Sequence, residues 1–317
     1  MNKKELNADV PYIGLFGKRL DQILPKLFIQ YSRSCFKKWI LMKNVYVNGK
    51  VENQPDKRML GGEKITIYPL FEKNLIHLPQ NIFLNIVYED DNILIINKPA
   101  GLVVHPGAGN KDGTILNALL YRYKNINSIP RCGIVHRLDK NTSGLMIVAK
   151  TIISYVKLIE LLKKRKIVRE YQAIVKGKMI TGGTVNMPIM RHPLKRTCMM
   201  THPLGKKSIT HYKIIYRFKF HTHIILKLET GRTHQIRTHM LHIRYPILGD
   251  PLYSGINYGL KNFKEDQNYL EKCCFFRQAL HAHYIKFIHP ITKNLMSWTI
   301  PLPQDMQDLL FYLSKRK

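Results

Sequence analysis

Short apolar runs that alternate with helical stretches restrict the fold of this chain more than any other feature. Four strand-like runs lie at Asn92–Ile96, Gly133–Val135, Gly144–Ala149 and Glu170–Val175. Helical spacing of apolar residues occurs at Thr114–Tyr121 and Ile152–Lys166. This alternation predicts a domain that mixes α and β structure. No run approaches the ~18 apolar residues that a membrane span requires, so we expect a protein that does not enter the membrane.

A small unit with its own pattern precedes this region. A first helix is indicated by the spacing of Leu20, Ile23, Leu24 and Leu27. A second helix carries Phe36, Trp39 and Ile40 on one face and turns Arg33, Lys37 and Lys38 toward water. The residues from Val45 to Val51 alternate around an Asn-Gly pair, which predicts a β-hairpin. With a linker over Phe71–Asn81, we expect a module at residues 18–76 and a larger domain at residues 77–317.

The charge of the chain points to an anionic partner. Its 51 Lys and Arg residues against 21 Asp and Glu give a formal charge of +30 at pH 7. A field of this strength attracts polyanions such as nucleic acid or an acidic membrane face. A drift toward lysine-rich composition would give a similar excess, so the charge favours nucleic acid without establishing it.

Cysteine usage and the N-terminus indicate the compartment. The five cysteines form no Cys-x-x-Cys pair and have no spacing typical of a disulfide framework. Reduced thiols in a cytosol explain this best. The first residues turn polar at once and do not enter the apolar region of a signal peptide. We therefore expect a soluble, cytoplasmic protein.

One carboxylate, Asp139, lies in a loop that the pattern places between two strands, with Arg137 and Lys140 beside it. Neighbouring cations favour the charged form of a carboxylate, so we expect Asp139 to be ionised at neutral pH. An ionised aspartate is suited to act as a nucleophile or a general base. A structural ion pair would produce the same local sequence, and this loop alone leaves both interpretations open.

A second polar segment follows an alternating strand that starts near His223 and breaks at Gly231 into a helix. The apolar stripe of this helix is Ile236, Met240 and Ile243, so we expect Arg237 to leave from a different face. Arginines near such a turn can hold a carboxylate or a phosphate with two hydrogen bonds. Histidines 234, 239 and 242 lack the His-Glu-x-x-His spacing, and no carboxylate lies between them, so we expect no metal.

Five segments stand in order along the chain: Asn97–Gly101, His136–Asp139, Thr142–Leu145, Gly231–Arg237 and Gly249–Tyr253. Together they resemble the signature of the ribosomal and transfer RNA pseudouridine synthases related to synthase A. The front unit resembles the S4 RNA-binding module, whose two helices present basic side chains to RNA phosphates. The resemblance covers nearly the whole chain. It implies an α+β catalytic domain with a long, bent, mixed but mostly antiparallel sheet flanked by helices.

The resemblance also assigns residues. It makes Asp139 the essential aspartate, Tyr171 the tyrosine that stacks on the target uracil, and Arg237 the partner of Asp139. Without the resemblance, Tyr171 would be interpreted as a strand residue in the core. The substrate contacts that we expect are Arg137, His136 and Arg232 in the large domain, and Arg33, Lys37 and Lys38 in the front module.

The implied reaction breaks the N-glycosidic bond of a uridine, turns the bound uracil and rejoins it to ribose through C5. No hydride, phosphate or external energy is exchanged, so we expect no cofactor, and neither a phosphate-binding loop nor a Gly-x-Gly-x-x-Gly segment is present. The stretch from Arg191 to Tyr212, together with the S4-like front module, resembles a branch of the family that acts on large-subunit (23S) ribosomal RNA or its assembly intermediates, with the helix 69 stem-loop as target. The basic run from Arg191 to Lys213 could be solvated, but we expect a loop that grips an RNA stem. We expect a monomer. A transfer RNA pseudouridine synthase and a non-catalytic RNA-binding assembly factor remain as alternatives.

Overall fold

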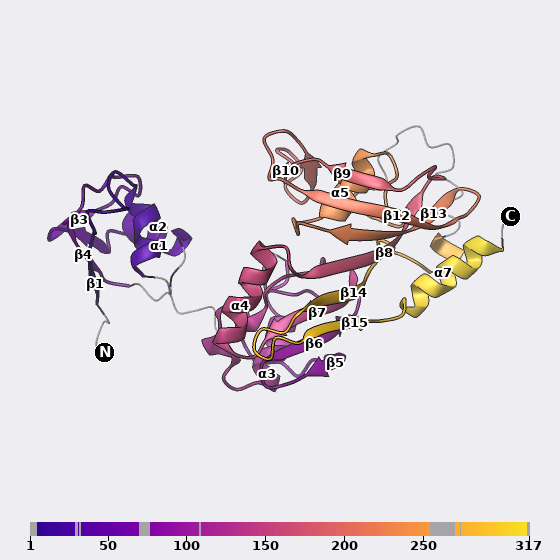
Figure 1. Ribbon diagram of the computed structural model, residues 1–317, viewed down its shortest axis with the longest axis horizontal. Helices are drawn as coiled ribbons and strands as arrows, with labels where there is room; N and C mark the ends of the chain where they lie inside the picture. The colour runs from indigo at the N-terminus through magenta and orange to yellow at the C-terminus, as the bar shows by residue number, and fades with distance from the viewer. Residues whose placement is uncertain are drawn as a thin grey trace. The chain divides into compact units, whose positions relative to one another are not determined.

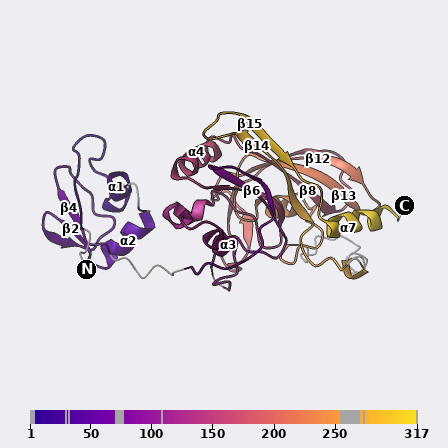
Figure 2. The ribbon, with the colours of Figure 1, turned by 90° about the horizontal axis from the view of Figure 1, so that it is seen from below.

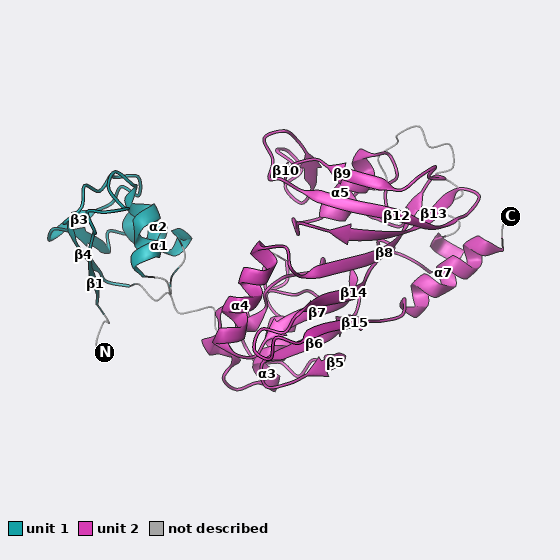
Figure 3. Cartoon of the chain, viewed as in Figure 1, with its two compact units in different colours: residues 1–76 teal, residues 77–317 magenta. Residues whose placement is uncertain are grey.

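A computed structural model describes residues 5–28, 31, 33–69, 77–107, 109–253, 270–272 and 274–315. The chain divides into two compact units, residues 1–76 and residues 77–317 (Figure 3). Each unit buries its own apolar residues: the first has one core, and the second has two sets of mutually packed side chains. Residues 70–76, which include the first part of the stretch interpreted as a linker, lie outside the described residues.

The first unit packs two helices on a four-stranded sheet (Figure 1). The helices are α1 (Leu20–Leu27) and α2 (Arg33–Leu41), and the sheet order is β1 (Leu6–Asp9), β4 (Lys64–Ile67), β2 (Val45–Val47) and β3 (Lys50–Glu52). Between β2 and β3, Asn48 and Gly49 both have positive φ, at 50° and 76°. A two-residue hairpin turn of type I′ requires this conformation, which is why the Asn-Gly pair predicted the hairpin correctly.

The second unit is built on one large sheet. Its order is β5-β6-β7-β14-β8-β13-β12-β9, and β15 pairs with β14. The strands are β5 (Ile86–Glu89), β6 (Ile93–Lys98), β7 (Ser143–Ala149), β8 (Val168–Lys176), β9 (Gly183–Asn186), β12 (Ile209–Arg217), β13 (His221–Leu228), β14 (Leu280–Ile288) and β15 (Leu295–Thr299). A separate hairpin joins β10 (Ile189–Arg191) to β11 (Met199–Thr201). Among the described strands of the large sheet, only β7 and β14 pair in parallel, so the prediction of a mostly antiparallel sheet is confirmed.

Helices cover both faces of this sheet. The helices are α3 (Ile115–Arg122), α4 (Ile152–Lys163), α5 (Gln235–His242) and α7 (Gln304–Ser314). Side chains alternate along β6, so Leu94 and Ile96 enter the core shared with α3, α5 and α7, while Ile93 and Ile95 enter the core shared with α4. Figure 2 shows α3 and α4 on opposite sides of β6. No helix in the described part of the chain is long and apolar enough to cross a membrane.

The strand expected at Gly133–Val135 is wrong. The chain there forms a 3₁₀ turn, η2 (Pro130–Gly133), and Ile134 makes only an isolated bridge to Val148. Gly133 has a φ of 76°, and a Cβ on it would lie 1.9 Å from the carbonyl oxygen of Ala149. Arg131 and Cys132 also have positive φ, at 55° and 51°, so the backbone enters this segment in a left-handed turn and not in the extended conformation of a strand. Asp139 therefore lies between a turn and β7, not between two strands.

The parallel contact between β7 and β14 depends on Gly144, which is opposite Ala282. Its φ is 119°, and a Cβ would lie 2.3 Å from the Ala282 carbonyl oxygen. We expect Gly144→Ala to lower the free energy of unfolding by about 3 kcal/mol or more, because both the backbone and the strand spacing must change. Gly101 is the matched control, since it has a φ of 87° but no atom within 4 Å of its Cβ position. Gly101→Ala should cost only about 1–2 kcal/mol.

Urea unfolding of the two variants and the wild type, followed by circular dichroism, measures this difference. Equal losses in the two alanine variants would contradict the close approach of β7 and β14 at Gly144.

Candidate active site

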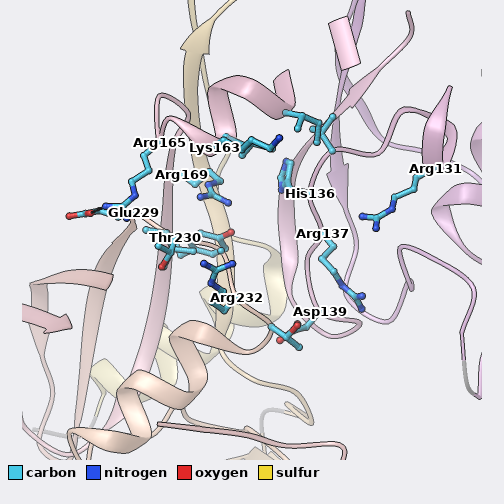
Figure 4. A pocket seen from close by; sticks show the side chains of 17 residues that line it. Arg131, His136, Arg137, Asp139, Lys163, Arg165, Arg169, Glu229, Thr230 and Arg232 are labelled. Carbon is cyan, nitrogen blue, oxygen red and sulfur yellow. Dashed lines mark hydrogen bonds and ion pairs between the residues drawn. The ribbon is translucent and has the colours of Figure 1, made fainter. Parts of the chain in front are cut away.

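A cavity of about 570 Å³ opens beside β8, between the end of α4, the end of β13 and the loop that carries Asp139 (Figure 4). Six cationic side chains line it: Arg131, Arg137, Lys163, Arg165, Arg169 and Arg232. The acidic residues on its wall are Asp139 and Glu229. A concave surface with this excess of positive charge attracts an anionic ligand.

Asp139 is held through one of its two oxygens. Arg237 donates from Nη1 to Oδ2 of Asp139 at 2.9 Å, and His234 Nε2 lies 3.8 Å from the same oxygen. Among the described residues, Oδ1 accepts no hydrogen bond. The side chain of Asp139 is 19% exposed and lines the cavity. The carboxylate is thus fixed in position while one oxygen remains available.

Arg237 is fixed in turn by a second carboxylate. Its Nε and Nη2 donate to Asp250 Oδ2 and Oδ1 at 2.6 and 2.8 Å, and the exposed fractions of Arg237 and Asp250 are 4% and 0%. Burial alone would lower the pKa of Arg237, but the hydrogen bonds and charge of Asp250, with a contribution from Asp139, raise it. The guanidinium also lies 5.0 Å from the centre of the Tyr253 ring. A side chain opposite the apolar stripe of a helix is commonly exposed to solvent. Arg237 is instead buried and faces Asp139 and Asp250.

A buried lysine, Lys98, binds the backbone of the loop that carries Asp139. Lys98 Nζ donates to three backbone oxygens, those of Pro99, Leu102 and Lys140, at 2.7, 2.9 and 2.8 Å. Burial lowers the pKa of Lys98 to about 7, and the charge of Asp139 opposes this shift. Three carbonyl acceptors match the three N–H donors of the charged ammonium form. The ammonium group thereby joins the start of the domain to the residue after Asp139.

Two further side chains hold the same loop. Arg277 donates from Nη1 to the carbonyl oxygen of Asn141 at 3.3 Å, and Gln278 donates from Nε2 to Thr142 Oγ1 at 3.1 Å. Both come from the segment just before β14, so the loop is anchored by residues far away in the sequence.

Tyr171 and His136 form the inner wall of the cavity. Tyr171 is a buried residue of β8, and burial raises the pKa of its hydroxyl, an effect that Arg169 opposes. His136 Nε2 accepts a hydrogen bond from the Ile147 amide at 3.0 Å. Burial and the charge of Arg169 lower the pKa of His136 to about 3. The imidazole is therefore neutral, with its proton on Nδ1.

The structure brings most of the sequence-predicted residues to one place. Asp139, Tyr171, Arg137 and Arg232 line both the cavity and a smaller hollow of about 50 Å³. Arg237 lines the smaller hollow, and His136 lines the larger cavity.

The remaining predicted residues lie in the first unit, on α2. Arg33 forms an ion pair with Asp21, with 2.6 Å between Nη2 and Oδ2. Lys37 is exposed, and Lys38 is half-buried.

Sequence reasoning missed three residues of this region. Asp250 and Lys98 belong to segments that carried the family resemblance, Gly249–Tyr253 and Asn97–Gly101, but neither was singled out. Arg169 lies two residues before Tyr171 and lines the cavity. For Lys98 and Asp250 the informative signal is a lone charged residue within an otherwise apolar run, which suggests a buried charge with a partner. Arg169 stands beside Glu170 and close to the basic residues 163–166, so its sequence neighbourhood gives no such signal.

The histidines near Arg237 have structural contacts. His239 Nε2 interacts with the Met187 carbonyl oxygen at 2.9 Å, and His234 Nδ1 with the Tyr253 hydroxyl at 2.9 Å. Within the described ranges, no group of three or more His, Cys, Asp or Glu side chains could hold a metal ion.

Comparison with known proteins places this site in a family. The family model of RNA pseudouridylate synthases matches residues 92–242, and the S4 domain model matches residues 18–65. The chain is 73% identical to ribosomal large subunit pseudouridine synthase D of Buchnera aphidicola subsp. Schizaphis graminum over 315 residues, which cover 99% of this chain and 100% of that protein. The chain belongs to the RNA pseudouridine synthase family.

Two further relatives of this pseudouridine synthase support the assignment. The Escherichia coli K12 protein of the same name is 54% identical over 295 residues, which cover 93% of this chain and 90% of that protein. The solved structure of human RNA pseudouridylate synthase domain containing 4 matches with a TM-score of 0.57 at 25% identity, over 73% of this chain and 93% of that one. The resemblance inferred from the five sequence segments and the front module is confirmed.

The two Asp–Arg pairs of this synthase differ in burial and make a matched test. Asp250 is fully buried against Arg237, whereas Asp305 is partly exposed and makes an equivalent two-bond contact with Arg277. We expect Asp250→Asn to cost about 3–5 kcal/mol of folding free energy, because a buried guanidinium loses its main partner. Asp305→Asn should cost less, about 1–2 kcal/mol, because Asp305 is partly exposed and water can replace it as the partner of Arg277.

Chemical denaturation of the two variants measures the difference in their folding free energies. Pseudouridine formation is then measured at a temperature where both variants are folded. Asp250→Asn should also lose activity, because Arg237 is then free to move away from Asp139. Equal effects of the two substitutions would show that burial of the Asp250 pair has no special role.

Proposed function

We propose that this protein isomerises uridines of large-subunit ribosomal RNA to pseudouridine, with Asp139 as the catalytic carboxylate. The observation that carries this proposal is the single-oxygen attachment of Asp139 to Arg237, which leaves Oδ1 available beside the cavity. An ionised carboxylate with an available oxygen can act as a nucleophile or a general base. Arg237 orients the carboxylate, and Asp250 keeps Arg237 in place.

The other cavity residues fit the handling of a flipped nucleotide. Because the reacting atoms of a stacked uridine are covered by its neighbours, the nucleotide must leave the stack at a cost of about a few kcal/mol. We assign Tyr171 to stacking on the uracil, and Arg137 to the gap that the nucleotide leaves or to its backbone. His136 and Arg232 complete the contacts. The glycosidic N1–C1′ bond breaks, a C5–C1′ bond forms, C5 loses a proton and N1 gains one, so no cofactor is required.

The substrate class rests on the relatives and on the charge. The relatives at 73% and 54% identity are named as ribosomal large subunit pseudouridine synthases over nearly their full length. The chain carries a net charge of +30, which suits a large folded RNA. We propose the helix 69 stem-loop of 23S RNA, free or in an assembly intermediate, as target, with the first unit binding RNA through Arg33, Lys37 and Lys38. We further propose that the enzyme is a cytoplasmic monomer.

The central test is Asp139→Asn. The amide keeps the shape of the side chain but removes the charge, so pseudouridine formation should fall by at least about 10²-fold. Folding should be retained, because Arg237 keeps Asp250 as a partner. RNA affinity should change by less than about threefold, because the carboxylate is not a phosphate ligand.

The assay maps pseudouridine in transcribed large-subunit RNA and, in parallel, in transfer RNA. Asp91→Asn serves as a control Asp-to-Asn change at an exposed position outside the cavity. Wild-type turnover by Asp139→Asn would disprove the assignment, and activity restricted to transfer RNA would disprove the proposed substrate.

A second test concerns the first unit. Deletion of residues 1–76 should weaken RNA binding and reduce its salt dependence while the second unit, with its own core, remains folded. Each lost phosphate contact lowers the slope of log affinity against log salt by roughly 0.7–0.9. The narrower double change Lys37→Gln and Lys38→Gln should give part of the same effect.

Filter binding or fluorescence anisotropy at several salt concentrations measures these slopes. An unchanged slope and affinity after the deletion would show that the first unit binds a partner other than RNA.

A further inference from the structure

Arg169 is a buried arginine without an acidic partner. It belongs to β8, is 8% exposed, and lines the cavity two residues before Tyr171 (Figure 4). Its Nε has no hydrogen-bond partner, and among the described residues no carboxylate forms an ion pair with it. Arg237 and Arg277 are similarly buried, at 4% and 7%, and each has an aspartate on two of its nitrogens. Arg169 thus differs from both of them.

An isolated buried charge is costly for a folded protein. Arginine does not give up its proton in proteins, so Arg169 cannot avoid the cost by becoming neutral. Removing a charged group from water without a compensating partner costs several kcal/mol. The field of this charge is felt in the cavity, since it lowers the pKa of His136 and opposes the rise in the pKa of Tyr171. A feature with this cost is expected where a ligand supplies the missing partner.

The backbone next to Arg169 is shaped to admit its guanidinium. Gly231 has no left-handed φ, so its own backbone conformation does not require glycine. A Cβ on Gly231 would lie 2.7 Å from Arg169 Nη1. The missing side chain therefore leaves space for the guanidinium at the wall of the cavity. This observation is independent of the unpartnered Nε, and it indicates that the backbone at Gly231 accommodates the guanidinium in this position.

The shape of the cavity indicates which part of an RNA would reach Arg169. Arg169 lines the large cavity but not the smaller hollow, which is lined by Asp139, Tyr171 and Arg237. Asp139 and Tyr171 also line the large cavity, so a nucleotide whose base lies next to Asp139 and Arg237 can extend into the large cavity through its backbone, where Arg169 can meet it. A planar guanidinium binds a phosphate with two parallel hydrogen bonds and matches its geometry better than it matches a single carbonyl oxygen.

We propose that Arg169 binds a phosphodiester group of the substrate RNA adjacent to the uridine that enters the cavity. This deepens the proposed function and rests on it. The phosphate supplies the acidic partner that the free protein lacks. Arg169 is thus a specific binding residue for the backbone of the flipped nucleotide, in contrast to the exposed basic residues that attract RNA of any sequence.

The proposal predicts opposite effects of one substitution on stability and on binding. Arg169→Met keeps an apolar side chain of similar length and removes the buried charge, so the free protein should unfold about 2–4 °C higher. RNA affinity should fall about tenfold. A residue that only stabilises the fold would show the reverse, with a lower unfolding temperature and unchanged affinity, and that result would overturn the proposal.

The location of the contact is tested with neutral phosphates. A large-subunit RNA fragment containing a mapped pseudouridine site is synthesised with single methylphosphonates at each position within two nucleotides of the target. The nucleotide preceding each methylphosphonate is 2′-deoxy for stability, and the matching deoxy RNA with normal phosphates is the reference. Binding is measured for wild type, for Arg169→Gln, and for Lys124→Gln, which removes an exposed cation from another part of the second unit.

The wild type and Lys124→Gln should each lose about tenfold in affinity at one of these positions. Arg169→Gln should bind the reference RNA about tenfold more weakly and lose less than twofold further at that position, because its contact is already absent. Equal sensitivity of Arg169→Gln and wild type at every position would overturn the proposal, since the contact would then be to a base or absent. A wild type that binds the fragment without forming pseudouridine would count against the proposed function and leave the phosphate measurement intact.

Discussion

The arrangement of this active site depends on one buried guanidinium that lies between two carboxylates. Arg237 belongs to α5, Asp139 to the loop before β7, and Asp250 to the segment after α5, so the three side chains connect parts of the domain that are distant in sequence. Because Asp250 occupies two of the nitrogens of Arg237, only Nη1 is directed at Asp139. The carboxylate at the cavity is therefore oriented through one oxygen, while the other oxygen remains available.

Charges inside this domain fall into two groups with different physical roles. Arg237, Arg277 and Lys98 have acceptors for their buried donors and hold the backbone around Asp139 in one conformation. Arg169 lacks such a partner and faces the cavity. Stability and ligand binding are thus served by different residues, even though both groups are buried cations in the same sheet and loops. Substitution of a paired cation should therefore destabilise the fold, whereas substitution of Arg169 should mainly weaken RNA binding.

Sequence reasoning identified what local chemistry determines. The Asn48-Gly49 pair adopts the positive φ angles that its turn requires. The apolar residues of β6 alternate between two cores, and those of α1 and α2 recur at helical spacing on one face. The strand expected at Gly133–Val135 failed because the backbone is left-handed at Arg131, Cys132 and Gly133, which the pattern of apolar residues does not reveal. Arg237 looked like a polar residue opposite an apolar stripe, because a sequence does not separate an exposed charge from a buried, paired one. Asp250 and Arg169 were missed for the same reason, since their significance lies in which charges they do or do not meet.

The place of β14 in the sheet has a consequence for how the enzyme is made. This strand, Leu280–Ile288, lies between β7 and β8, which are themselves far earlier in the chain and pair with it from opposite sides. The ribosome releases residues in order, so the central sheet cannot close until nearly all of the second unit has been synthesised. The first unit, whose core residues all lie within residues 1–76, has no such constraint. A nascent chain can therefore acquire a folded first unit well before it acquires a complete active site, and newly made enzyme stays inactive until its last strands emerge.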